Sequence, residues 1–239
     1  MPVRSKYESL PTEAINPATL AIDKLPYDWK TYPVIHLDLG AMQADSADRL
    51  EELLCYGLDD CSRLYGVSLE RHGAGARFDE LIQAIARRVG KVVVLVDEYD
   101  KPILGNIQDT EAVKEIRDLL KGFYSVLKSA DPHLRFVFLT GVSKFSKVSV
   151  FSDLNNLRDL SMDPAYADLL GYTEEELGRY FGEAIRALSA KEGWTYEKTL
   201  EKIRAWYNGY RFSREPTTVY NPVSVMSLLE TREFRNYWF

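Results

Sequence analysis

The chain has 239 residues and a net charge of −6, with 46% hydrophobic, 12% aromatic and 28% charged residues. This balance is ordinary for globular proteins and excludes the collagen-like, intrinsically disordered and disulfide-scaffold classes. A chain of this length can bury about 70–75% of its unfolded surface, so a hydrophobic core needs no disulfide or structural metal.

The charge and the apolar segments also bear on partners and location. Thirty Lys and Arg against 36 Asp and Glu give no basic excess, so nucleic acid is not indicated as a partner. The N-terminus contains no secretory signal, and the longest apolar run, Val92–Val96, is far shorter than the roughly 20 residues that cross a bilayer. Cys55 and Cys61 have no CxxC partner and are expected to be buried small hydrophobes. We therefore expect a cytoplasmic protein without a membrane segment.

In chain order, the first predicted element is an irregular N-terminal arm over residues 1–31, which contain four prolines and little periodicity. The run at 34–39 predicts a strand closed by Gly40. Apolar residues at helical spacing then predict two helices, over 46–64 and 78–89.

The strongest signal is the β-branched run Val92–Val96, which is typical of a strand buried on both faces of a parallel sheet. A helix is predicted over 111–128, and a further buried strand from Leu134 to Val142. The alternation of strands and helices is that of right-handed βαβ units. Residues 32–170 are therefore predicted to form an α/β core around a parallel sheet.

From residue 171 the pattern changes to helices, with no predicted strand. Thr173 and Glu176 form a capping box that opens one helix, a second is predicted over 196–207, and a third begins at Pro222. Residues 171–239 are therefore predicted to be a small helical subdomain.

Some less specific features have ordinary structural interpretations. The aromatic run 206–212 is interpreted as packed core with Gly209 as a helix C-cap, rather than as a base-stacking platform. His36 is interpreted as structural, His72 and His133 as solvated turn residues, and the pair Asn155-Asn156 as a local turn.

Two acidic residues directly follow the central predicted strand. Ligands of open α/β sheets bind beyond the carboxyl ends of the strands. A hydrophobic strand that ends in Asp-Glu is the pattern of a Walker B motif. Asp97 would then be a Mg²⁺ ligand, and Glu98 would orient and deprotonate the water that attacks a γ-phosphate. The alternative is an acidic loop that only ends the strand and begins a turn at Pro102.

A second polar group follows the next predicted strand. Thr140 is predicted to contact the same phosphate or the attacking water, and Lys144 to reach developing negative charge. The alternative is that Thr140-Gly141 is only a turn and that Lys144 is a solvated charge.

Together, five segments resemble the bacterial predicted AAA-ATPase family of P-loop NTPases. They are YPVIHLDL (32–39), VVVLVDEYDKPI (92–103), FVFLTGVSKFSKVSVFSDLNNLRDLS (136–161), GYTEEEL (171–177) and WYNGYRF with YNPVSV (206–225). The resemblance covers nearly all of residues 20–230. It implies an ASCE-type P-loop core with Walker B at Asp97 and Glu98, a sensor near Thr140, ATP and Mg²⁺ as cofactors, and a helical lid over about 171–230. Family members often continue into a nuclease-like domain of the PD-(D/E)XK type.

The sequence departs from the family pattern before the first predicted strand. The family has a phosphate loop there, typically R-P-R-R-F-G-K-[ST], whereas residues 1–31 contain no GK[ST] and no glycine. Such a loop surrounds phosphates with backbone N–H groups, and glycine is needed where the backbone comes that close. Loss of this segment also predicts unpaired sheet edges or an altered strand order.

These features predict an N-terminally truncated ATPase domain that binds ATP poorly by itself. A rival interpretation is a non-catalytic module, a pseudo-ATPase that recruits a protein partner or associates with itself. A less favoured one is a metal-dependent nuclease that uses Asp97, Glu98, Asp100 and Lys101. Such nucleases usually take their acids and lysine from successive strands.

Overall fold

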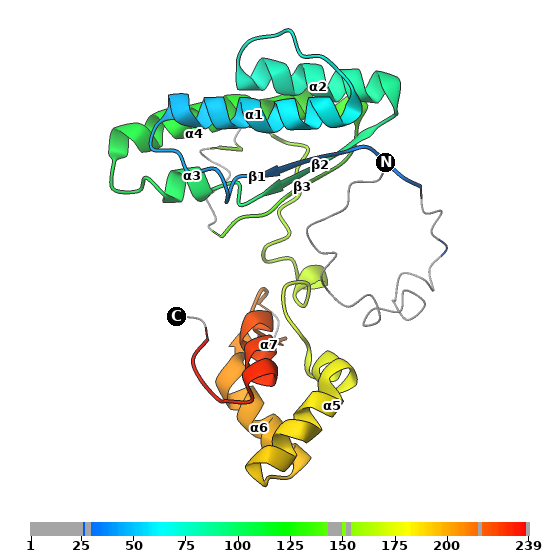
Figure 1. The fold of residues 1–239 in the computed structure, drawn as a ribbon, viewed down its shortest axis with the longest axis vertical. Helices are drawn as coiled ribbons and strands as arrows, with labels where there is room; N and C mark the ends of the chain where they lie inside the picture. The colour runs from blue at the N-terminus through cyan, green and yellow to red at the C-terminus, as the bar shows by residue number, and fades with distance from the viewer. Residues whose placement is uncertain (1–25, 27–29, 143–149, 152–153, 215–216, 238–239) are drawn as a thin grey trace. The chain divides into compact units, whose positions relative to one another are not determined.

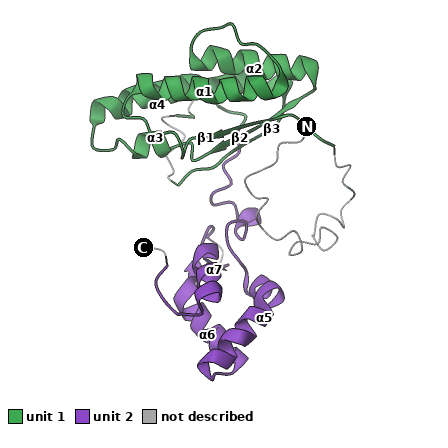
Figure 2. Ribbon diagram, viewed as in Figure 1, with its two compact units in different colours: residues 1–156 green, residues 157–239 purple. Residues whose placement is uncertain are grey.

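The computed structural model describes residues 26, 30–142, 150–151, 154–214 and 217–237 (Figure 1). The chain divides into two compact units, Met1–Asn156 and Leu157–Phe239 (Figure 2). The predicted arm over 1–31 lies almost entirely outside the described residues. The predicted boundary after residue 170 lies further along the chain than this division.

A parallel three-stranded sheet forms the centre of the first unit. Its strands are β1 (Val34–Asp38), β2 (Val92–Asp97) and β3 (Leu134–Leu139), in the order β1-β2-β3. The mixed α/β class predicted from the sequence is confirmed. The prediction that the third strand continues to Val142 was wrong, because β3 ends at Leu139.

Helices follow β1 and β2. They are α1 (Ala47–Tyr65), α2 (Ala74–Arg88), the short α3 (Lys101–Leu104), which the sequence did not predict, and α4 (Thr110–Ser129), followed by a 3₁₀ turn, η3 (Asp131–His133). The Ser46 side chain caps α1 by accepting a hydrogen bond from the Arg49 N–H, and Gly66 ends the helix with left-handed φ. Asp109 caps α4 in the same way as Ser46 caps α1.

The long helices α1, α2 and α4 lie on one face of the sheet (Figure 1). Alternate strand residues point toward them, so Leu37, Val92 and Val94 are buried. On the helix side, the rings of Phe78 and Phe123 stack with their centroids 4.6 Å apart and complete the core.

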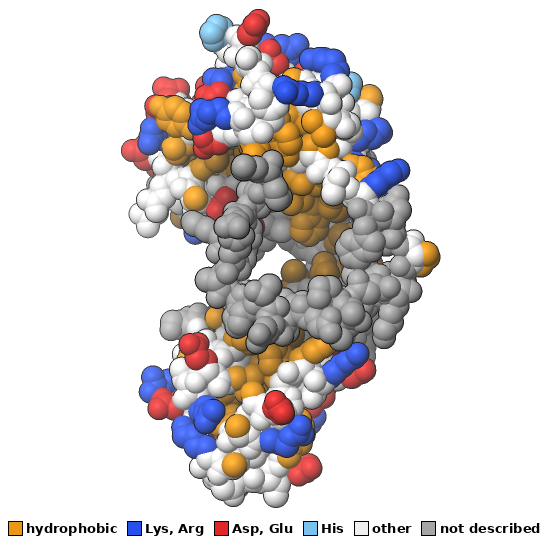
Figure 3. All heavy atoms as spheres, turned by 45° about the vertical axis from the view of Figure 1, so that its right-hand side comes forward, with side chains coloured by type: hydrophobic (Ala, Val, Ile, Leu, Met, Phe, Trp, Pro, Cys, Tyr) orange, Lys and Arg blue, Asp and Glu red, His pale blue; other side chains and the backbone are white. Residues whose placement is uncertain are grey.

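The opposite face of the sheet keeps apolar side chains at the surface. Val34 is 36% exposed, Phe136 53% and Phe138 36%, and Val93 and Leu95 are only half-buried. Figure 3 shows hydrophobic side chains on the surface of this unit. The prediction that the central strand is buried on both faces was therefore wrong for the described residues.

Both cysteines lie on α1 and are free. Each is only half-buried, so the expectation of full burial was wrong. Burial nevertheless raises the pKa of both thiols. Among the described helices, none combines the length and apolar character that crossing a membrane requires.

The second unit contains three helices and a small hairpin. After a 3₁₀ turn, η4 (Pro164–Tyr166), its elements are α5 (Glu174–Glu192), α6 (Tyr196–Tyr207), β4 (Asn208–Tyr210), β5 (Val219–Tyr220) and α7 (Pro222–Thr231). The capping box at Thr173 is present as predicted. The antiparallel pair β4-β5 corrects the expectation of a strand-free segment. Gly209, with φ of 119°, lies within β4 and is not the C-cap of α6, which is Asn208.

An apolar core joins the elements of the second unit. Its buried members are Leu177, Ile185, Leu188, Ile203, Tyr207, Tyr220, Val225 and Leu228. The core interpretation of the aromatic run therefore holds for Tyr207. Its neighbour Trp206 is 45% exposed.

A charged contact in this unit predicts a pH-dependent stability. The Arg204 guanidinium donates to the Glu174 carboxylate, as does the buried Tyr220 hydroxyl, and the Arg204 bond chiefly lowers the pKa of Glu174. A carboxylate with a lowered folded-state pKa stabilises the protein above its ordinary pKa, and this gain disappears as pH falls through the folded value. Both charged side chains are about half exposed, which limits the gain to about 0.5–1 kcal/mol.

We therefore expect Glu174→Gln to lower the free energy of unfolding by about that amount at pH 7. Urea denaturation at pH 7 and at pH 3 measures the difference, which should shrink at the lower pH. An equal loss of unfolding free energy at both pH values would contradict the pairing of Glu174 with Arg204. Glu197→Gln, on the exposed side of α6, is the control.

Candidate functional site at the strand ends

The carboxyl ends of the three strands meet at one edge of the sheet. Asp38 at the end of β1 is the Cα partner of Asp97 at the end of β2. The Leu39 N–H donates to the Asp97 carbonyl oxygen at 3.0 Å, and the Thr140 N–H donates to the Val96 carbonyl oxygen at 2.9 Å. The ladder therefore brings the predicted residues Asp97 and Thr140 together at this edge.

A hydrogen-bonded group joins the side chains of Asp97 and Thr140. The Thr140 hydroxyl donates to Asp97 Oδ1, and the Glu98 N–H lies 3.1 Å from the same oxygen and 3.4 Å from Thr140 Oγ1. Asp97 is exposed, whereas Glu98 and Thr140 are half-buried. The hydroxyl and the backbone thus hold one carboxylate oxygen in place at a surface that a ligand can reach.

Glu98 has a backbone conformation that is uncommon for a residue with a side chain. Its φ is +50°, a left-handed value that costs about 1–3 kcal/mol and that occurs at helix ends, as at Arg232 after α7, and at active sites. The conformation turns the chain sharply after β2. The Glu98 carboxylate then lies 3.7 Å from the Lys101 ammonium group.

Residues at the end of β1 complete this edge, and sequence reasoning did not assign them to the site. A Cβ on Gly40 would lie 2.9 Å from the Glu98 carboxylate and 3.1 Å from Asp38 Oδ1. The Glu98 carboxylate thus occupies the space beside Gly40, just after β1, and would have to shift if this residue carried a Cβ. One sequence signal could have assigned Asp38 to the site: it lies at the end of a predicted strand, as Asp97 does at the end of the next strand.

Two other predicted residues do not join this group. The Asp100 carboxylate is fully buried and accepts a hydrogen bond from the Val142 N–H at 3.3 Å, so it does not face outward with Asp97. Lys144 lies outside the described residues. Within the part of the chain that the structure describes, no three His, Cys, Asp or Glu side chains are placed to hold a metal ion.

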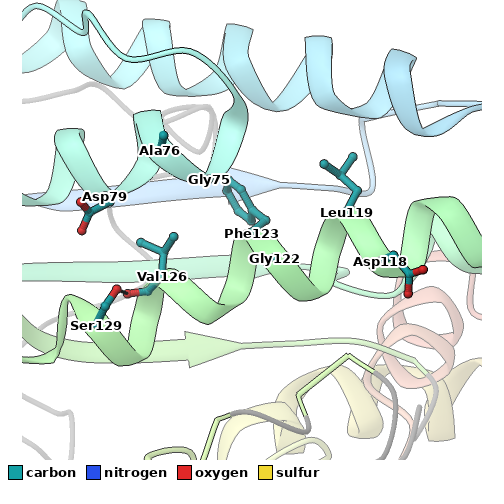
Figure 4. Close-up of a pocket in the computed structure, with 9 residues that line it drawn as sticks. All are labelled: Gly75, Ala76, Asp79, Asp118, Leu119, Gly122, Phe123, Val126 and Ser129. Atoms are coloured by element: carbon teal, nitrogen blue, oxygen red, sulfur yellow. Dashed lines mark hydrogen bonds between the residues drawn. The ribbon is translucent and has the colours of Figure 1, made fainter.

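A surface groove lies between α2 and α4 (Figure 4). Small residues open it, since Gly75 faces the backbone of Gly122, and Asp79 and Asp118 lie along its rim. The Asp79 carboxylate accepts hydrogen bonds from the Arg71 guanidinium and the Gln83 amide. The groove is thus a feature of helix packing, and the chemistry-bearing side chains lie at the strand ends.

Comparison with known proteins gives two matches. A family model described as "Predicted AAA-ATPase" matches residues 17–151. A curated relative, "Uncharacterized protein in vnfD 5'region" from Azotobacter chroococcum mcd 1, is 45% identical over 215 residues, which is 89% of this chain. The match covers 39% of that relative, so the chain spans about two fifths of its length. No solved structure matches.

Proposed function

Because this chain belongs to the predicted AAA-ATPase family, we propose that it is the part of an ASCE-type P-loop ATPase domain that carries the Walker B acids. The observation that supports this assignment is the hydrogen-bonded group at the strand ends. Asp97, Glu98 and Thr140 come from adjacent parallel strands, and ligands of such sheets bind beyond these ends.

Each member of this group has a distinct role in the proposal. Asp97 offers a carboxylate oxygen at an exposed edge, the hard donor type that Mg²⁺ prefers, and would hold the ion. The bound ion would neutralise charge on the ATP phosphates. Glu98 would accept the proton of the attacking water. Thr140 would fix the Asp97 carboxylate through its hydroxyl, with Lys144 as a proposed contact for phosphate charge.

The edge and the exposed face of the sheet favour a further element that packs or pairs there. In the described sheet, β3 is an edge strand, and Phe136 and Phe138 on it are exposed. The backbone groups along an edge strand can pair with a further strand, and we assign this edge to the strand that carries the phosphate loop, supplied by sequence outside this chain. Parallel sheets normally have both faces covered, so we also expect the face with Phe136 and Phe138 to be covered. The second unit is the proposed helical lid, and the cytoplasm is the proposed location.

The chain by itself is therefore expected to bind Mg²⁺-ATP poorly, since its sequence contains no GK[ST] phosphate-loop motif. Isothermal titration with Mg²⁺-ATP should give no binding in the low micromolar range. A polypeptide extended by the proposed strand and loop should bind. Low micromolar affinity of the present chain would refute the truncation and leave the roles of the acids open to test.

The exposed phenylalanines also favour a second candidate, a non-catalytic interaction module that covers this face with a protein partner or another copy. The two proposals differ in a simple measurement. If the chain is an interaction module that associates with itself, light scattering after size-exclusion chromatography will show a stable oligomer whose mass Mg²⁺-ATP does not change. The nuclease hypothesis is not favoured, because Asp100 is buried and bonded to Val142.

A further inference from the structure

The stretch of chain that follows α7 is held against the second unit without forming a helix or a strand. Residues 233–237 have no regular secondary structure, yet the Phe234 and Tyr237 side chains are half-buried and pack against the apolar core of this unit. Arg235 and Asn236 between them are exposed. Two aromatic side chains three residues apart thus anchor an otherwise exposed stretch, which is how an extended peptide binds to a protein surface.

An aromatic cluster, formed by Trp194 before α6 and by Trp206 and Tyr207 at its end, receives the Phe234 ring. This ring stacks on the Tyr207 ring at an interplanar angle of 7°, with the centroids 6.2 Å apart. Its centroid also lies 5.9 Å from the Trp194 ring and 6.0 Å from the Trp206 ring. Each contact lies within the range at which aromatic pairs attract one another.

A single hydroxyl group holds the main chain of the segment. The Tyr207 hydroxyl donates to the Arg235 carbonyl oxygen at 2.8 Å and lies 3.2 Å from the Arg235 N–H, which donates to it. Burial is the main cause that raises the pKa of Tyr207, so the hydroxyl stays protonated at neutral pH. These contacts need an extended main chain and an aromatic side chain, and the same segment of another copy would supply both.

Arg232 is the hinge between α7 and this segment. Its φ of 56° and ψ of 36° are left-handed, and its N–H donates to the Leu228 carbonyl oxygen at 2.7 Å. Glycine adopts this conformation readily, whereas a residue with a side chain is strained in it. Strain of this kind is released when the hinge becomes extended. A short, strained hinge favours exchange of the element that it carries between identical chains.

The surface around the hinge carries charges of both signs. Glu230, Arg232, Glu233 and Arg235 are all exposed. Five extended residues span at most about 18 Å, so two copies that exchange the segment bring the ends of their α7 helices together. Around a twofold axis the acids of one copy can then face the arginines of the other, which makes this surface self-complementary.

We infer that residues 233–237 are an exchangeable segment, and that two copies of the chain associate by placing it on each other's aromatic cluster with Arg232 as the hinge. The partner of this surface is therefore a second copy of the chain. The contact involves neither the acids at the strand ends nor the exposed face of the sheet, so it does not depend on the proposed function.

NMR on an equal mixture of isotope-labelled and unlabelled copies of the present chain tests the exchange directly. Isotope-filtered nuclear Overhauser effects should connect the labelled Trp206 ring with the unlabelled Phe234 ring. Such an effect arises only when Phe234 of one copy lies on Trp206 of another. If the Phe234 ring shows these effects only within single copies, the inference is wrong.

Arg232→Gly and Arg232→Val test the hinge. Glycine favours the left-handed conformation and hence the closed monomer, whereas β-branched valine disfavours it and should favour the exchanged dimer. Because each dimer opens two hinges, the dimer of Arg232→Val should dissociate with a Kd at least about tenfold lower than that of Arg232→Gly. Light scattering after size-exclusion chromatography over a range of concentrations measures both. Equal constants would overturn the inference, and if Arg232→Val does not fold, Arg232→Gly is compared with the wild type.

Phe234→Ala and Phe136→Ser separate this contact from association through the exposed sheet face. Phe234→Ala removes the ring that lies on the aromatic cluster and should give a monomer. Phe136→Ser changes only the exposed side of β3 and should leave the dimer intact. A dimer that persists in Phe234→Ala and is lost in Phe136→Ser would contradict the exchange and place the contact on the sheet.

Discussion

Replacing Gly141 with alanine should destabilise the first unit clearly, although the change adds only one methyl group. The added Cβ would lie 2.4 Å from Cε1 of the Tyr99 ring and 2.7 Å from Asp100 Oδ1, well inside van der Waals contact. Neither neighbour can move easily, since the Tyr99 ring packs on Phe151 and Asp100 is fully buried. Overpacking of this kind costs about 1–3 kcal/mol. Urea denaturation should therefore show a loss of that size.

A second glycine provides the matched control for this change. Gly122 lies within α4, and a Cβ there would have no neighbour within 4 Å. Gly122→Ala should stabilise the protein by about 0.5–1 kcal/mol, because alanine favours the helix. The opposite signs of the two effects test the structure at the strand ends. If Gly141→Ala were as stable as the wild type, the close approach of β2 and β3 beyond their ends would be wrong.

Replacing Glu98 with glutamine should abolish ATP hydrolysis in a form of the protein that contains the phosphate loop. Glutamine keeps the size of the side chain but cannot accept a proton from water, so kcat should fall by about 100-fold or more. Nucleotide affinity should be retained, because Glu98 is not assigned to hold the phosphates or the ion. Steady-state turnover and equilibrium binding, measured on the same preparation, separate the two effects.

The control for this experiment is Glu115→Gln, on the exposed side of α4. It makes the same chemical change far along the chain from the acidic turn and should leave turnover unchanged. Normal turnover in Glu98→Gln would remove Glu98 from its proposed role. A loss of nucleotide binding in this variant would instead assign Glu98 to the binding of ATP or of the metal ion.

The elements of the first unit were largely predictable because their signals are local. Val92–Val96 is β-branched throughout, and the apolar stripe of α4 repeats with helical spacing, so each specifies its own structure. The end of β3 was placed too late, at Val142, because this β-branched residue follows the strand after only Thr140 and Gly141. The Val142 N–H is bonded instead to Asp100, a contact between residues far apart in sequence.

The strands of the second unit were missed for a related reason. Asn208–Tyr210 and Val219–Tyr220 are short and contain no alternating pattern, and β4 includes a glycine. β5 pairs with β4 and also lies against the residues before α5: a Cβ on Gly171 would lie 2.4 Å from Val219 Cγ2, and Tyr172 forms an antiparallel bridge with Tyr220. Such pairing depends on tertiary contacts that no local pattern records.

The length and the ordinary composition of this protein establish only that the chain can build a core. The α/β class, the acids at the end of β2 and the family to which they point follow from residue type and from spacing along the chain. Which side chains meet depends on contacts between residues far apart in the sequence. Parallel register placed Asp38 beside Asp97 and Thr140 within hydrogen-bonding distance, whereas burial turned Asp100 toward Val142. The fold also left Phe136 and Phe138 exposed, because the described helices α1, α2 and α4 all pack on the other face of the sheet.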